Sequence, residues 1–125
     1  MMGVFSVRVR LLPNARGRVP RELEMVVDTG ASYTVIPRSI AEELGIRPVR
    51  RTVARLANGT RATMEMGQAE LEVGGLRTVT WIVFGDAEDV ALLGAVTLQE
   101  LGLEVDPTTE TLRPTDAYLL AAEAA

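Results

Sequence analysis

Strict alternation of apolar and polar residues over short runs is the feature that most constrains how this chain can fold. Every second residue is apolar in residues 5–11 and again in residues 23–27. A period of two places the apolar side chains on one face of a β-strand. Turn-forming pairs separate the later runs, above all Asn58-Gly59 and Gly74-Gly75. The pattern therefore predicts an all-β domain built largely from hairpins.

Further strands and two short helices complete the expected order of elements. We expect the strands at residues 52–57, 60–66, 69–73, 76–84, 90–93, 103–105 and 111–113. The helices are expected at residues 38–44 and 95–101, and each is followed by a glycine that can end it. At Asn58-Gly59 we expect a tight turn in which both residues take positive φ.

The length of the chain predicts one domain. A chain of 125 residues, of which 47% are hydrophobic and 24% charged, is typical of a globular protein and too short for two sizeable cores. We expect a single domain over residues 1–115. Residues 116–125 are rich in alanine, and Asp116 stands where it could cap a helix, so we expect a helical tail there.

Two residue types are missing, and their absence excludes several kinds of chemistry. The chain contains no cysteine and no histidine. Disulfides, thiol catalysis, cysteine-ligated metals and nucleophiles activated by histidine are thereby excluded. Chemistry near neutral pH must come from carboxylates, hydroxyls, arginine or a bound cofactor.

All of the basic residues are arginines, and five of them gather in one stretch. The formal net charge is −4, yet Arg47, Arg50, Arg51, Arg55 and Arg61 lie close together in the sequence. No aromatic residues are interleaved there to stack on bases, so we interpret the stretch as solvated surface and expect no nucleic-acid partner. No apolar run is long enough to span a membrane and no signal peptide is evident, so we expect a cytoplasmic protein without a membrane partner.

The segment that carries chemistry follows an apolar run. Asp28-Thr29-Gly30 comes directly after Met25-Val26-Val27. A carboxylate at the end of a buried strand is costly unless its hydrogen bonds are satisfied. Thr29 adds a hydroxyl, and Gly30 can adopt a turn that a side chain would block. A simpler interpretation is an aspartate that starts a turn by accepting a hydrogen bond from its own backbone.

Two motifs and a hairpin resemble the retroviral-type aspartic proteases, also called retropepsin-like or clan AA. Residues 27–35 resemble the active-site segment of that family, and residues 90–95 resemble its second signature of apolar residues and a glycine before a helix. The Asn58-Gly59 hairpin falls between them, where the family places its flap. The resemblance covers residues 4–106 and is greatest to the cellular, bacterial-type branch with a single lobe.

The resemblance implies a fold, a reaction and a set of residues. It implies an all-β, retropepsin-like closed β-barrel that forms one lobe of a homodimer. The activity would be that of an aspartic endopeptidase, with water activated between two Asp28 carboxylates and no metal or cofactor required. The catalytic segment would be Asp28, Thr29 and Gly30. Substrate, with apolar residues around the cleaved bond, would contact Ala31, Ser32, Val35, Asn58, Gly59, Val90 and Leu92.

The sequence departs from the viral pattern in three places. Viral members carry an Asp and an Arg that pair with each other where this chain has Ser32 and Ala95. Both partners are missing together, so no lone buried charge is left behind. The flap tip has a single glycine, Gly59, and the viral terminal strands that seal the dimer have no clear match after Arg113.

Two alternatives remain compatible with the sequence. The first is a non-catalytic module on the same fold that binds peptides or dimerises. The second is a small β-rich domain unrelated to proteases, monomeric, in which Asp28 only forms a turn.

Overall fold

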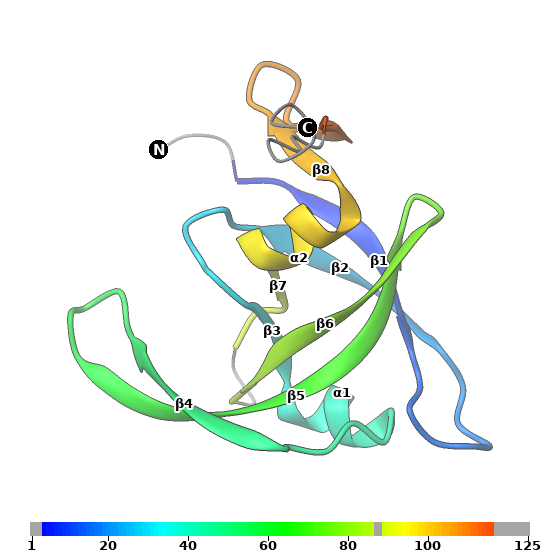
Figure 1. Ribbon diagram of the computed structural model, residues 1–125, viewed down its shortest axis with the longest axis vertical. Helices are drawn as coiled ribbons and strands as arrows, with labels where there is room; N and C mark the ends of the chain where they lie inside the picture. The colour runs from blue at the N-terminus through cyan, green and yellow to red at the C-terminus, as the bar shows by residue number, and fades with distance from the viewer. Residues whose placement is uncertain (1–3, 87–88, 117–125) are drawn as a thin grey trace, which may run out of the picture.

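The structure is a computed structural model that describes residues 4–86 and 89–116 (Figure 1). Its strands are β1 (Ser6–Leu12), β2 (Arg21–Val27), β3 (Thr34–Pro37), β4 (Arg50–Arg55), β5 (Arg61–Val73), β6 (Leu76–Gly85), β7 (Leu92–Leu93), β8 (Leu103–Asp106) and β9 (Thr111–Pro114). Its helices are α1 (Arg38–Glu43) and α2 (Ala95–Leu101). The expected elements are present in the expected order, but β3 was not predicted, because it is short and pairs only with the distant β6 and β7. Residues 61–73 form one continuous strand, and β7 is shorter than the expected strand at residues 90–93.

Seven strands form one sheet that closes on itself. The order is β1-β2-β7-β3-β6-β5-β4, and β1 also pairs with β5. The pairing of β1 with β5 closes the strands β1, β2, β7, β3, β6 and β5 into a barrel and leaves β4 outside it. The β4–β5 hairpin therefore projects from the barrel as a flap (Figure 1). The predicted all-β closed barrel is confirmed.

The alternation along the sequence determines which side chains fill the barrel. Val9, Leu11 and Met25 are fully buried, while the residues between them face outward. In β6 only the half from Thr80 onward is enclosed by the barrel. Val79, in the other half, is 57% exposed because only one face of the strand is covered there.

Both helices end at glycines in the left-handed conformation. Gly45 follows α1 with φ 76°, and Gly102 follows α2 with φ 71°. A side chain would be strained at this φ, which explains why glycine recurs at both helix ends. The predicted starts are also confirmed, since Pro37 precedes α1 and Gly94 precedes α2.

The turn of the flap differs from the expected one. Gly59 has φ 87°, but Asn58 is not in the positive-φ region. The Gly59 N–H donates to the Leu56 carbonyl at 2.9 Å, and the Leu56 N–H donates to the Thr60 carbonyl at 2.8 Å. These bonds define a three-residue loop in which only the last residue needs positive φ. Asn58 instead stabilises the loop through Oδ1, which accepts from the Thr60 N–H at 3.0 Å.

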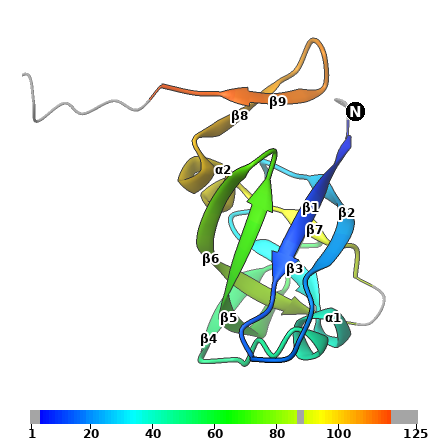
Figure 2. The ribbon, with the colours of Figure 1, turned by 90° about the vertical axis from the view of Figure 1, so that its right-hand side faces the viewer.

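The last two strands form a separate hairpin that stands beyond the barrel (Figure 2). Arg113 bridges Glu104 at 2.8 Å and Asp106 at 3.3 Å. Hydrogen bonds from Thr115 and Arg113 hold the pKa of Glu104 below its ordinary value. The tail expected to be helical lies outside the described residues, apart from Asp116. Within the described part of the chain, no helix is long and apolar enough to cross a membrane.

Gly94 permits the closest approach of backbone segments near the end of β2. A Cβ atom at this position would lie 2.5 Å from the carbonyl carbon of Tyr33 and 2.6 Å from its oxygen. Both atoms belong to backbone, which cannot rotate away as a side chain can. Glycine is therefore required where β7 and α2 cross the start of β3.

We predict that Gly94→Ala destabilises the protein by about 3 kcal/mol or more, because the added methyl group forces backbone apart. Gly17→Ala is the matched control. Gly17 has positive φ, at 79°, whereas Gly94 has φ −92°. No atom lies within 4 Å of the place that a Cβ atom at Gly17 would take, so only about 1 kcal/mol of backbone strain is expected there. Urea unfolding of the two variants measures the difference, and equal losses would contradict the steric explanation.

Candidate active site

Asp28 follows directly after β2, and hydrogen bonds fix both its backbone and its carboxylate. Its N–H donates to the Leu93 carbonyl at 3.0 Å, which continues the parallel pairing of β2 with β7. Its Oδ1 accepts from the Gly30 N–H at 2.9 Å. The aspartate does therefore form the local turn that the simpler interpretation expected. The same bond also fixes the plane of a half-buried carboxylate, as catalysis would require.

Backbone hydrogen bonds tie the loop after Asp28 to the start of α2. The Ala95 N–H donates to the Ala31 carbonyl at 2.8 Å, and the Val96 N–H donates to the Ser32 carbonyl at 3.0 Å. Ser32 and Ala95 are the two positions at which the viral ion pair is missing. The loop and the helix thus remain attached through main-chain bonds that do not depend on side-chain charge.

Three buried threonine hydroxyls connect β3, β6 and α2 beneath this loop. Thr97 Oγ1 lies 2.6 Å from Thr34 Oγ1 and 2.8 Å from Thr80 Oγ1. Thr34 Oγ1 also accepts from the Gly94 N–H at 3.0 Å. All three threonines are at most 1% exposed. The network holds Gly94, and with it the start of α2, at a set distance from β3.

A groove of about 720 Å³ opens beside Asp28 and under the flap. Its lining comprises Asp28, Gly30, Ala31, Ser32, Tyr33, Val35, residues 52–57, Met64, Val83 and Leu92. Of the substrate contacts expected from the sequence, the structure brings four to this groove: Ala31, Ser32, Val35 and Leu92. Most of its side chains are apolar, so the groove suits an extended apolar ligand.

Four of the expected site residues lie outside that lining. Thr29 is exposed at the tip of the loop, next to the groove. Asn58 and Gly59 stand at the exposed end of the flap, beyond the residues that cover the groove. Val90 is 59% exposed because β7 begins only at Leu92. Within a single chain, these residues are neighbours of the groove and do not form its wall.

Sequence reasoning missed the wall that the flap supplies. Thr52 is paired with Met64 and Ala54 with Ala62, and side chains paired across strands share one face. These four residues are half-buried, whereas Val53 and Thr63 between them are exposed. The alternation in residues 52–55 and 61–64 carried this information, because it marks the inner face of the hairpin. Val83 gave no such signal, since its place depends on how β6 crosses the barrel.

The site offers one carboxylate that can accept or donate a proton at the edge of an apolar groove. Among the described residues, no three Asp or Glu side chains come close enough together to hold a metal ion. Asp28 can contribute proton transfer and hydrogen bonding at this position.

Comparison with known proteins agrees with this arrangement. Residues 20–100 match the family described as "gag-polyprotein putative aspartyl protease". The solution structure of the protease of simian foamy virus (mac) is similar in fold, with a TM-score of 0.54 at 17% sequence identity. That similarity covers 75% of this chain and 91% of the viral one. No curated protein matches the sequence.

We predict that Thr97→Val destabilises the protein by about 2 kcal/mol, because Thr80 loses its hydroxyl partner while buried. Thr63→Val on the exposed face of the flap is the control and should change stability by less than about 0.5 kcal/mol. Chemical denaturation measures both values. If the two substitutions prove equally mild, the buried hydroxyls do not hold the loop.

Proposed function

Because this chain belongs to the family of retroviral-type aspartyl proteases, we propose that it is an aspartic endopeptidase that works as a homodimer. Family membership sets aside the hypothesis of an unrelated β-rich domain. In the proposed dimer, Asp28 of each copy supplies one of two carboxylates that act together. The substrate is a polypeptide with apolar side chains around the cleaved bond.

The placement of Asp28 is the observation that supports this proposal. Its carboxylate is oriented by the Gly30 N–H at the edge of a groove large enough for a peptide. Thr29 and Gly30 are both exposed beside it. A second copy related by a twofold axis could therefore bring its own Asp28 to the same point, and a twofold interface places equivalent residues opposite each other. In this scheme Thr29 would hydrogen-bond across the axis.

The proposed mechanism uses the pair of carboxylates as acid and base. Two carboxylates a few ångströms apart do not both ionise readily, so they share one proton. The ionised carboxylate removes a proton from a bound water, which attacks the carbonyl carbon of the peptide bond. The protonated carboxylate donates its proton to the carbonyl oxygen, and a proton then reaches the leaving nitrogen. No covalent bond to the enzyme forms.

The walls of the groove supply the proposed substrate preference. Val35, Leu92 and Val83 form an apolar floor, and the inner face of the flap forms the roof. Apolar substrate side chains would bury surface there and gain free energy in proportion to the area covered. Asn58 and Gly59 at the flap tip would close over the substrate and exclude water.

Asp28→Asn tests the catalytic role. We expect this substitution to reduce the cleavage of a peptide library at least 100-fold, because asparagine can neither remove nor supply the proton. Mass spectrometry of the digests measures the loss. Ser32→Ala is the matched control, since it changes a neighbouring groove residue without touching the carboxylate. Binding without cleavage by the unaltered protein would favour a non-catalytic peptide-binding module, and equal cleavage by Asp28→Asn would exclude Asp28 as the catalyst.

Dilution and mixing test the proposed homodimer. Below the dissociation constant of the dimer, we expect activity per chain to fall in proportion to protein concentration, because only pairs are active. A tenfold excess of Asp28→Asn chains should lower wild-type activity about tenfold by forming mixed pairs. Activity that is independent of dilution and unaffected by the inactive chains would show that a single chain suffices.

A further inference from the structure

The charges of the flap set it apart from the rest of the surface. Six arginines form ion pairs with carboxylates within the described part of the chain: Arg8, Arg10, Arg21, Arg38, Arg77 and Arg113. The flap arginines, defined as Arg50, Arg51, Arg55 and Arg61, lie in no ion pair there, a property that they share with Arg16, Arg18 and Arg47. Glu65 is the only acidic residue in β4 or in residues 61–66 of β5, and it pairs with Arg38 at 2.6 Å.

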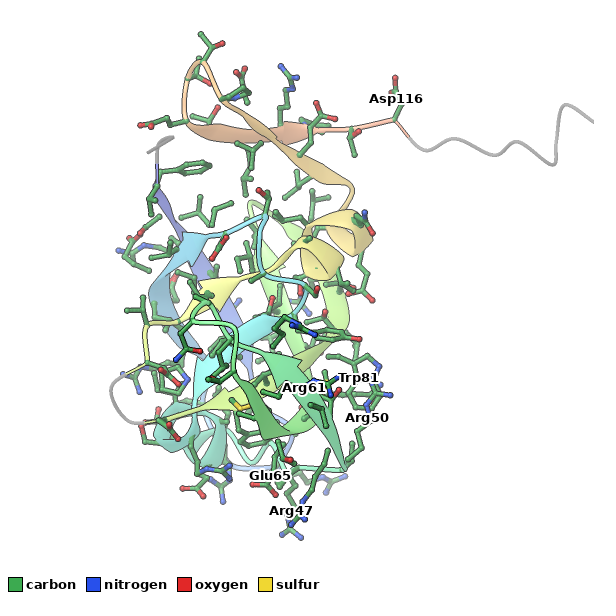
Figure 3. The ribbon with its side chains drawn as sticks, turned by 90° about the vertical axis from the view of Figure 1, so that its left-hand side faces the viewer. Arg47, Arg50, Arg61, Glu65, Trp81 and Asp116 are labelled. Carbon is green, nitrogen blue, oxygen red and sulfur yellow. The ribbon has the colours of Figure 1, made fainter. Side chains whose placement is uncertain are left out.

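Arg50 lies on the same face of the sheet as the groove wall. Across the strands it is paired with Met66, which is paired with Val83, a residue of the groove. The guanidinium of Arg50 stacks on the ring of Trp81 at 4.1 Å from the ring centre (Figure 3). Stacking fixes the flat face of the guanidinium and leaves its N–H groups free at the edge. A carboxylate just beyond the apolar groove could accept hydrogen bonds from them.

Arg55 and Arg61 are paired at the other end of the flap, on the opposite face from Arg50, where Arg55 reaches the rim of the groove. They are directly opposite each other at the last pair of the flap before its turn, and both are exposed. Like charges in directly opposed positions destabilise a hairpin. Arg55 also contributes to the lining of the groove. An anion held between the two guanidinium groups would remove this repulsion, so the flap pairs better when one is bound.

We propose that three of the flap arginines, Arg50, Arg55 and Arg61, recognise acidic residues of the polypeptide substrate on either side of the apolar residues that enter the groove. This rests on the proposed function, since it assigns a substrate class to the same groove. Arg50, oriented by Trp81, binds one carboxylate at the end of the groove. Arg55 and Arg61 bind another at the flap.

Two features favour an acidic peptide over a nucleic acid. The positive charge borders an apolar groove sized for side chains, and the ring of Trp81, which could otherwise stack on a base, is already covered by Arg50. The chain as a whole has a formal net charge of −4, which repels long polyanions. Preference for an acidic ligand must therefore come from the local charge of the flap and cannot arise from the protein's overall field.

Binding to paired peptides tests the proposal independently of catalysis. The probes are fluorescein-labelled peptides with the same apolar centre, flanked by two glutamates in one and two glutamines in the other. They are titrated with full-length Asp28→Asn protein, which leaves them intact, and binding is followed by anisotropy. We expect the glutamate peptide to bind roughly tenfold more tightly at low ionic strength, with the difference shrinking as salt is added.

Substitutions identify the arginines that cause the preference for the glutamate peptide. Arg50→Gln and the double variant Arg55→Gln/Arg61→Gln should each reduce the ratio of the two affinities at least threefold, while affinity for the glutamine peptide stays within about twofold. The double variant relieves repulsion, so it should fold at least as well as the parent. Arg16→Gln in the β1–β2 loop is the control, because it removes an equal charge from an exposed arginine outside the flap.

Three results would overturn the proposal. They are equal affinity for the two peptides, an equal effect of Arg16→Gln, and tighter binding of a single-stranded oligothymidylate than of the glutamate peptide at the same salt. Cleavage of the glutamine peptide by the unaltered protein tests the endopeptidase separately. If the unaltered protein does not cleave the glutamine peptide but the binding preference for the glutamate peptide remains, the proposed endopeptidase function is refuted and the acidic preference is not.

Discussion

The attachment of the Asp28 loop to the start of α2 is the constraint on which the rest of this structure depends. The Asp28 N–H donates a hydrogen bond to the Leu93 carbonyl. The carbonyls of Ala31 and Ser32, in the loop that follows, accept hydrogen bonds from the first two N–H groups of α2. Gly94 makes the contact possible because no side chain separates it from Tyr33. Distant segments of sequence are thus joined at the point where the carboxylate emerges.

This attachment explains how the fold tolerates the loss of the viral ion pair. A buried pair of charges contributes little once its desolvation is counted, and losing both partners leaves nothing unsatisfied. Main-chain bonds and the hydroxyls of Thr34, Thr80 and Thr97 hold the same segments together without charge.

The groove and the flap divide the proposed recognition between two kinds of force. Apolar walls stabilise a bound side chain in proportion to the apolar area that it buries, and they discriminate only weakly between different apolar side chains. Charge at the rim makes binding depend on the orientation of the ligand, because Arg50, stacked on Trp81, presents its N–H groups along one edge. A substrate with an apolar centre and acidic flanks would satisfy both, whereas either feature alone would satisfy one.

The sequence by itself determined both helix ends, the position of Asp28 and the strands other than β3, because alternation, helix-ending glycines and turn residues act over a few neighbouring positions. It missed β3, which is short and pairs only with the distant β6 and β7. The sequence also predicted Val35 and Leu92 as part of the groove, through the resemblance to a family. Alternation marked the inner face of the flap, but only the tertiary structure brought that face and Val83 to the same groove and left Val90 outside it. Those outcomes depend on how β6 crosses the barrel and where β7 begins pairing, which are set by contacts between residues far apart in the chain.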